Sequence, residues 1–192
     1  MADRQLPSID LLRQLLRYDP ETGKLFWLVR PVSMFTESSC KGTANRSAEW
    51  AHKSWNTRCA GNEAFTADSG KGYRQGSIFG RTYKAHRVIF ALVYGAWPSE
   101  EVDHENVCGG DNRLTNLRAA TSSQNKQNRR RAKHNTSGFK GVSWHRRKGK
   151  WAASIKMNGR QKHLGYFESG EAAHQAYLLA AQESQGVFAR AQ

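Results

Sequence analysis

Residues 102–125 read VDHENVCGGDNRLTNLRAATSSQN, and this stretch decides the fold that we expect for the centre of the chain. The opening Val-Asp-His triplet predicts a short strand that ends by presenting an acid and an imidazole side by side. Two glycines and an Asp-Asn pair then indicate a loop. A second apolar pair, Leu114 and Leu117, follows, and a polar helix is expected to begin near Ser122.

Three polar positions in this stretch have a spacing that suggests chemistry: His104, Asn116 twelve residues later, and Asn125 nine residues after that. The spacing resembles the HNH nuclease motif, in the branch of HNH homing endonucleases from phages and introns that has Asn in the third position. The Asp103-His104 pair and the Gln-Asn-x-x-Asn pattern of residues 124–128 fit that branch. The resemblance implies a ββα-metal unit that holds one divalent ion between a strand and a helix.

The residue types of this motif suit phosphodiester hydrolysis, which needs an activated water and a cation that absorbs charge on the phosphate. A neutral His104, with an ordinary pKa of ~6.5, is a suitable general base. Asp103 and the Asn125 carbonyl are hard oxygen ligands, which favour Mg²⁺ or Mn²⁺. Asn116 is expected to hold the loop through backbone hydrogen bonds. The alternative interpretation is a chance Asp-His dipeptide followed by turn and cap asparagines.

The residues upstream of the motif extend the resemblance. Two short strands are expected over 73–79 and 81–86, joined at Gly80, and a buried apolar helix should follow and end at Gly95. This order resembles the same phage HNH family upstream of its active site. His86, at the strand-to-helix junction, has two open roles: contact with the metal site or a phosphate, or a cap or core hydrogen bond.

The N-terminal third contains one clear region and one unclear region. Ser8 and leucines at helical spacing predict a short capped helix, and a strand is expected over 24–29. From residue 30 to residue 62 no regular period is present. A DNA-contacting excursion and a small extra subdomain are both open for this stretch.

The last segment forms a separate pattern. Strands are expected over 141–144, 151–157 and 162–167, with the hairpin signal Asn-Gly before the third, and a helix over about 170–185. This βββα order, with Gly-Lys-Trp-Ala-Ala-x-Ile-Lys and Glu-Ala-Ala-x-x-Ala-Tyr, resembles over about 137–186 the DNA-binding domain named for the plant Apetala and ethylene-response factors. That resemblance implies a sheet that enters the major groove. The residues that we expect to contact DNA are Arg129, Arg130, Arg131, Lys140, Arg146, Arg147, Lys148, Lys150, Trp151, Lys156, Arg160 and Lys162.

The charge is strongly positive and unevenly distributed. The chain of 192 residues has a formal net charge of +14, and residues 112–167 contain fifteen Lys and Arg but no Asp or Glu. Such self-repulsion indicates a polyanionic partner, most commonly nucleic acid. Membrane phosphates and ribosomal RNA could also balance it.

Several classes of protein are disfavoured by what the sequence lacks. No apolar run approaches the ~18 residues that span a bilayer, and the N-terminus has no signal pattern, so no membrane association is expected and a cytoplasmic location is predicted. The three cysteines are scattered without a CxxC pair, which indicates neither a disulfide framework nor a zinc knuckle.

Together these patterns predict an α+β protein: a ββα-metal (HNH) nuclease core followed by a small three-stranded antiparallel sheet packed on one helix. The expected division is 1–128 with the motif at about 84–128, a basic linker over 129–136, and the DNA-binding domain over 137–188. The expected function is a metal-dependent endonuclease that cuts double-stranded DNA, of homing type or a nickase, encoded by a phage or mobile element. A DNA-binding regulator with an inactive motif and an RNA-associated basic protein are the alternatives. A monomer and a homodimer both remain possible.

Overall fold

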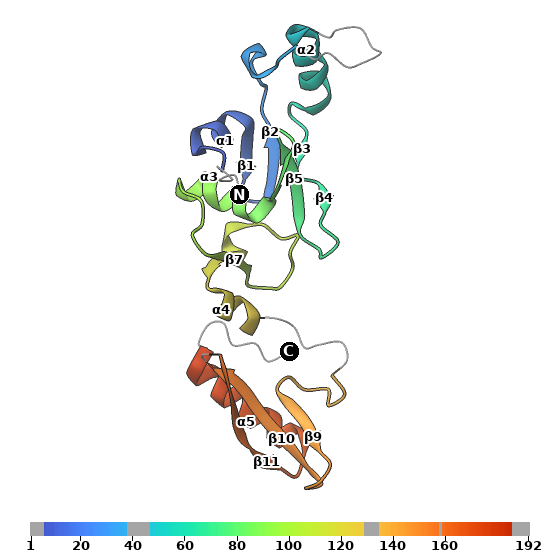
Figure 1. Cartoon of the computed structure of the whole chain (residues 1–192), viewed down its shortest axis with the longest axis vertical. Coiled ribbons are helices and arrows are strands. Elements are labelled where there is room, and N and C mark those ends of the chain that lie inside the picture. Colours follow the sequence, from blue (N-terminus) through green and yellow to red (C-terminus); the bar gives the residue numbers. More distant parts are fainter. Residues whose placement is uncertain (1–5, 38–46, 129–134, 158, 186–192) are drawn as a thin grey trace. The chain divides into compact units, whose positions relative to one another are not determined.

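The computed structural model describes residues 6–37, 47–128, 135–157 and 159–185. It divides into two compact units, Met1–Arg118 and Ala119–Gln192 (Figure 1). Within the described ranges, no helix combines the length and the apolar character that crossing a lipid bilayer requires.

The first unit consists of short helices and small antiparallel sheets. In one sheet the strand order is β1-β2-β3, in another it is β4-β5-β6, and β7 pairs with β8. In chain order the elements are α1 (Ile9–Leu15), β1 (Leu16–Asp19), β2 (Lys24–Trp27), the 3-10 turn η1 (Val32–Met34), α2 (Ala48–Cys59), β3 (Glu63–Ala64), β4 (Ala67–Asp68), β5 (Arg74–Ile78), β6 (Arg81–Lys84), α3 (Ala85–Tyr94), β7 (Glu101–His104), the 3-10 turn η2 (Leu114–Asn116) and β8 (Leu117–Ala120).

Helix α1 begins where the sequence predicts. The Ser8 side chain accepts a hydrogen bond of 3.2 Å from the Leu11 amide, which satisfies one of the unpaired donors of the first turn. The backbone then becomes extended at Leu16, which starts β1 instead of continuing the leucine stripe of the helix. Leu16 is nevertheless buried, so the strand uses the same apolar residue for the same core.

The hairpin and helix predicted before the motif are confirmed. Strands β5 and β6 pair Ile78 with Arg81, so a two-residue Phe79-Gly80 turn joins them. Both turn residues have positive φ, 47° and 78°, as the tight turns of hairpins require. Helix α3 follows and ends at Gly95, whose φ of 73° provides the left-handed cap.

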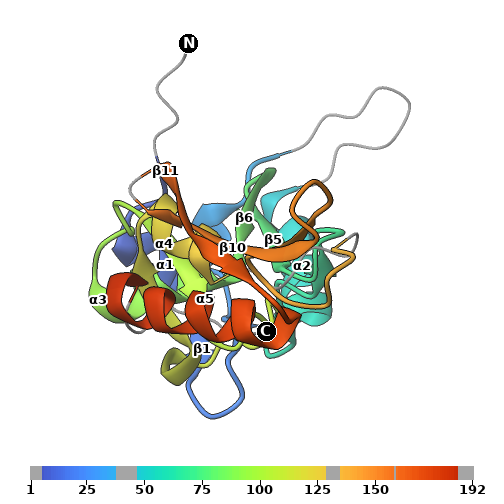
Figure 2. The same ribbon diagram turned by 90° about the horizontal axis from the view of Figure 1, so that it is seen from below.

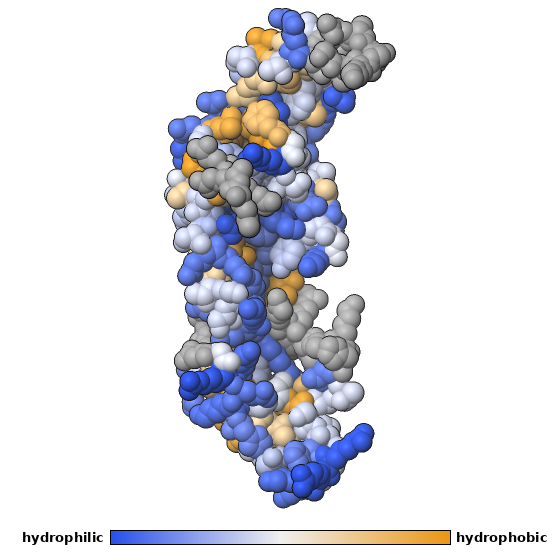
Figure 3. Space-filling model, in the orientation of Figure 1, coloured by the Kyte–Doolittle hydropathy of each residue, from blue (hydrophilic) through white to orange (hydrophobic). Residues whose placement is uncertain are grey.

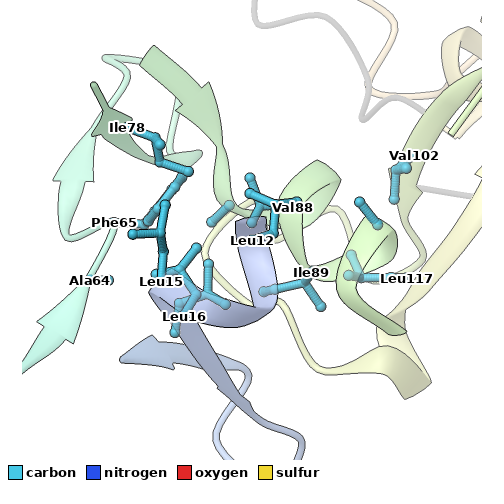
Figure 4. Close-up of a cluster of buried hydrophobic side chains, with 13 residues drawn as sticks. Leu12, Leu15, Leu16, Ala64, Phe65, Ile78, Val88, Ile89, Val102 and Leu117 are labelled. Carbon is cyan, nitrogen blue, oxygen red and sulfur yellow. The ribbon is translucent and has the colours of Figure 1, made fainter. Parts of the chain in front are cut away.

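The main core lies between α1, α3 and the sheets. Leu12 and Leu15 of α1 and Val88 and Ile89 of α3 are fully buried, and Figure 4 shows these side chains pointing toward one another. Val102 of β7 belongs to the same cluster. The core therefore fixes the strand that carries the Asp-His pair.

The stretch without a regular period contains a helix that the sequence did not predict. Helix α2 begins after Ser47, whose side chain accepts from the Trp50 amide at 3.2 Å, and it lies at one end of the first unit (Figure 1). None of its residues is fully buried, which explains why it lacks the apolar stripe by which amphipathic helices are recognised.

The second unit contains α4 (Ser122–Gln127), β9 (Val142–His145), β10 (Lys150–Met157), β11 (Arg160–Phe167) and α5 (Gly170–Gln185). The strand order is β11-β10-β9, antiparallel, and α5 lies along one face of the sheet (Figure 2). Ala173, Tyr177 and Ala181 face the sheet at a four-residue spacing, whereas Ala172 is exposed. The predicted α+β class and the three-stranded sheet on one helix are confirmed.

Candidate active site

Strand β7 brings Asp103 and His104 into the interior of the first unit. Both side chains are buried, with exposed fractions of 5% and 3%. Buried charged and polar groups persist only with partners, because their desolvation is costly. The partners of these two residues therefore define the site.

Asn112 orients the imidazole of His104. The Nε2 atom of His104 lies 3.0 Å from Oδ1 of Asn112, which is itself 3% exposed. With the amide oxygen as acceptor, Nε2 carries the ring proton and Nδ1 carries the lone pair. Tyr18 of β1 supports this arrangement, since its hydroxyl donates to the Asn112 carbonyl at 3.2 Å.

Asn116 contacts the backbone of the loop between β7 and β8 at two points. Its Oδ1 accepts from the Asn106 amide at 2.9 Å, and its Nδ2 donates to the Asp111 carbonyl at 2.7 Å. The loop is further fixed by Arg113, which forms an ion pair of 2.7 Å with Asp111 and lowers the pKa of that carboxyl group to about 2. The side chain of Asn116 thus stabilises the conformation of the loop by binding its backbone.

His86 lies beside His104. It is in the first turn of α3, 7% exposed, and its ring centroid lies 5.0 Å from that of His104 in an edge-to-face arrangement. Among the described residues its Nδ1 has no hydrogen-bond partner. Burial, with a smaller contribution from the neighbouring His104, lowers the pKa of His86 to about 3. Burial also lowers the pKa of His104, so both rings are neutral at pH 7.

Tyr73 completes this group of rings. Its ring centroid lies 5.4 Å from that of His86 and 5.6 Å from that of His104. A Cβ atom on Gly109 would lie 2.8 Å from the Tyr73 ring, so the loop needs a glycine here to pass close to it. The ammonium of Lys84 lies 5.6 Å from the centroid of the same ring. Sequence reasoning missed Tyr73, Lys84 and Asn112.

Arg118 of β8 neutralises Asp103. Its Nε and Nη2 atoms donate to Oδ2 of Asp103 at 3.1 and 3.0 Å, and the two side chains are 18% and 6% exposed. The Asp-Arg pair links the two strands of the motif at the level of the histidine. The pair compensates the charge of each buried or half-buried partner with that of the other.

Asn125, the third motif position, lies on α4 in the second unit. The helix begins with a capping box, in which Thr121 and Gln124 exchange side-chain and backbone hydrogen bonds. Within the described ranges, no group of three or more His, Cys, Asp or Glu side chains is arranged to hold a metal ion. Carboxylate oxygens such as those of Asp103 and amide oxygens such as that of Asn125 are, as residue types, ligands that hard cations prefer. The pairing of Asp103 with Asn125 on one ion stays a prediction.

In the second unit, the face of the sheet opposite α5 carries an aromatic and basic group. Tyr166 lies at its centre, with the ring centroids of His145 and His163 at 5.1 and 4.5 Å and the Lys148 ammonium 3.9 Å from the ring centroid. Ala152 pairs with Tyr166 and Ser154 with His163, which places these side chains on the outward face. In Figure 3 the visible face of this unit is mostly hydrophilic.

The predicted DNA-contacting residues fall into four groups. Arg129, Arg130 and Arg131 lie outside the described residues. Two have intramolecular partners: Lys140 donates to the Gln127 carbonyl at 2.7 Å, and Lys150 pairs with Glu168 at 2.7 Å. Trp151 pairs with Phe167 and lies edge-to-face against Trp144, half-buried on the side that packs with α5. The exposed members are Arg146, Arg147, Lys148, Lys156, Arg160 and Lys162.

Comparison with known families assigns the class of protein. Residues 83–127 match the family described as HNH endonuclease, and residues 137–186 match the AP2 domain. The chain belongs to the HNH endonuclease family and carries an AP2 domain after its nuclease domain. The resemblances expected from the two motifs are therefore confirmed.

A curated relative comes from a bacteriophage. The chain is 30% identical over 92 residues to Protein 3.8 of Escherichia phage T7, and the matched region covers 47% of this chain and 74% of that protein. No solved structure matches the chain.

Proposed function

We propose that this protein is a metal-dependent endonuclease that hydrolyses phosphodiester bonds in double-stranded DNA, as a site-specific homing-type enzyme or a nickase. The observation that carries the proposal is the buried, neutral His104 beside the Asp103 carboxylate. An imidazole held by Asn112 with its lone pair on Nδ1 is ready to accept a proton. The HNH and AP2 matches support a DNA-binding nuclease.

His104 acts as the general base that takes the proton of the attacking water. Asn112 sets the tautomer and orientation of its ring, and Tyr18 fixes Asn112. Asn116 shapes the loop around the site through its two backbone hydrogen bonds. The rings of His86 and Tyr73 pack beside the base. Among the described residues the Nδ1 of His86 has no hydrogen-bond partner, which suits it to a donor from the substrate or from solvent.

Asp103 and Asn125 are the residues that we expect to hold Mg²⁺ or Mn²⁺. When bound, such an ion stabilises negative charge on the phosphate and on the leaving oxygen. Magnesium keeps several waters and often takes only one or two carboxylates together with substrate phosphate. A site with one carboxylate and one amide therefore suits an ion that is completed by DNA.

The second unit supplies most of the affinity and the base contacts. Its exposed lysines and arginines contact phosphates, which positions the duplex, while the outward face around Tyr166 meets base edges. In this proposal residues 1–128 form the nuclease region, 129–136 a basic linker and 137–188 the DNA-binding domain. A phage or mobile-element origin is consistent with the relative in phage T7.

The test is conversion of supercoiled plasmid by the purified full chain, with Mg²⁺, with Mn²⁺ and with a chelator. The proposal predicts open-circle product only with a divalent ion, and loss of that product in the Asp103→Ala variant. A random-sequence duplex pool included in the assay removes the chance that the plasmid lacks the target site. Strong binding with no cleavage of plasmid or pool would contradict the proposal and favour a DNA-binding regulator.

A further inference from the structure

Helix α2 has an outward surface that none of the functions above uses. Its members follow the helical spacing i, i+3, i+4, i+7 and i+8, so they form one stripe along the helix. They line a shallow groove of about 430 Å³. The members of this α2 stripe are Trp50, Lys53, Ser54, Thr57 and Arg58.

The opposite side of α2 is fixed firmly to the first unit. Asn56 donates to the Arg30 carbonyl at 2.9 Å and accepts from the Arg30 amide at 3.0 Å. The Arg30 guanidinium is 7% exposed and lies 3.7 Å from the Trp55 ring centroid. Trp55 also packs edge-to-face on Trp27 of β2, with centroids 5.6 Å apart.

The contacts of Arg30 include a buried polar atom and a buried charge. Among the described residues, the Arg30 Nε has no hydrogen-bond partner, and burial lowers the pKa of the guanidinium. Burial of a cation is costly and its contact with aromatic rings offsets part of that cost, while α2 itself has no buried residue. These contacts lie on one side of α2 and leave the α2 stripe facing outward.

The side-chain types of the α2 stripe indicate the class of partner that it would bind. Lys53 and Arg58 are exposed cations, Ser54 and Thr57 are hydroxyl donors, and no carboxylate lies among them. Trp50, 49% exposed, adds a flat apolar surface. Cations and hydroxyls are the side chains that bind phosphate oxygens and sugars of nucleic acids, whereas a protein-binding helix usually presents a more apolar stripe.

We propose that the α2 stripe is a second DNA-binding surface, which contacts the phosphate backbone of the duplex that the nuclease cuts. The proposal rests on the proposed function in that the partner is the substrate DNA. It assigns a role to α2, which lies outside both the motif and the AP2 domain in the sequence. The surface adds affinity and lengthens the protected segment of DNA.

The test is DNA binding by the full-length Lys53→Gln/Arg58→Gln variant at several salt concentrations without divalent metal. The slope of log K against log salt is negative, and each lost phosphate contact reduces its magnitude by about 0.9. The magnitude should therefore decrease by about 1.8 in this variant. Hydroxyl-radical protection should also become shorter at one end. The matched control is Arg13→Gln/Arg17→Gln, which removes the same charge from exposed positions of α1 and β1.

The outcomes separate this proposal from the proposed function. A less steep salt dependence and a shorter protected DNA segment in the α2 variant, with the control unchanged, support the proposal. They do so even if no preparation cuts DNA with Mg²⁺. Equal slopes and equal protection in the α2 variant and wild type overturn it, even if wild type cuts normally. A slope that falls equally in both variants also overturns it, because net charge alone would then explain the effect. Unchanged thermal unfolding of both variants excludes misfolding.

Discussion

At the level of single residues, the candidate site is organised around the neutral imidazole of His104, which the Asn112 side chain holds. The Asn116 side chain holds the loop beside it. His104, Asn112 and Asn116 are linked to the loop backbone and to Tyr18 by hydrogen bonds between 2.7 and 3.2 Å. Each of these bonds joins groups that are buried or half-buried. Removing one partner therefore leaves a polar group without compensation, which costs more than the bond itself contributes.

Asn116→Ala should destabilise the first unit by about 1–3 kcal/mol, because the Asn106 amide and the Asp111 carbonyl lose their side-chain partner. Chemical denaturation measures this change. Thr115→Ala is the control, since Thr115 is the exposed neighbour on the same 3-10 turn. Equal stability of the two variants would show that Asn116 does not hold the loop.

His86 should make stability depend on pH. Its pKa of about 3 in the folded protein lies below the ~6.5 of an unfolded chain, so between these values the unfolded state binds the proton and the folded state does not. Stability therefore falls as pH falls through 6.5 toward 3, by about 2 kcal/mol between pH 8 and pH 5 from this group.

Urea denaturation of wild type and His86→Gln at pH 8 and pH 5 measures this contribution. The difference in unfolding free energy between the two pH values should shrink by about 2 kcal/mol in the variant. His163→Gln, at an exposed position, should leave the difference as in wild type. An unchanged pH dependence in His86→Gln would mean that the buried ring takes up a proton at its ordinary pKa.

Some residues of the site can be recognised from the sequence, and others cannot. Asp103, His104 and Asn116 could be predicted because they stand at fixed spacing around one strand and one loop. Tyr73 and Tyr18 could not, because their roles arise from contacts between segments far apart in the chain. Asn112 lies only eight residues after His104, but its spacing is typical of a turn residue and gives no sign that its side chain meets the imidazole. His86 was visible only as a histidine at an element junction, and its contact with His104 is tertiary.

At the scale of elements, close packing in the C-terminal unit depends on one glycine. Gly141, before β9, has φ of 77°, and a Cβ atom there would overlap the Tyr177 ring of α5. The position therefore needs both the left-handed backbone and the absence of a side chain. It ties the start of the sheet to the middle of the helix.

Gly141→Ala should destabilise the C-terminal unit more than Gly149→Ala. Both positions have positive φ, so each substitution costs about 1–2 kcal/mol of backbone energy, but nothing lies within 4 Å of a Cβ atom at Gly149. The overlap with Tyr177 adds about 1–3 kcal/mol at Gly141. Thermal unfolding of the two variants measures the difference, and equal losses would contradict the close packing.

Most elements could be predicted from local patterns, and the exceptions have physical reasons. The hairpin of β5 and β6, the helix α3 and the βββα order were visible in residue periodicity and turn signals. Strand β1 was hidden because Leu16 continues the leucine spacing of α1. Helix α2 was hidden because it is attached by Asn56 and by aromatic rings around Arg30, and not by an apolar stripe.

At the scale of the whole molecule, charge and chemistry are divided along the chain. The acidic and histidine side chains of the site lie in the first unit, and the region without acidic residues, 112–167, forms most of the AP2 sheet. Substitutions in the sheet should therefore change affinity for DNA, and substitutions in the site should change the cutting rate.

Lys156→Gln/Arg160→Gln should raise the Kd for duplex DNA, since both side chains are exposed on the AP2 sheet. The negative slope of log K against log salt should become less steep by about 1.8. Binding of full-length protein at several salt concentrations measures both quantities. Glu171→Gln, at an exposed position in the first turn of α5, should not weaken binding. A variant pair that binds as wild type does would place the DNA elsewhere than on these strands.

The most direct measurement is the single-turnover rate of plasmid nicking by His104→Ala and wild type in Mg²⁺, with DNA affinity measured in parallel. A general base contributes about 10²–10⁴-fold, so the variant should nick slower by that factor while its Kd stays within about threefold of wild type. Equal nicking rates at equal affinity would contradict the assignment of His104 as the base, and with it the account of the site.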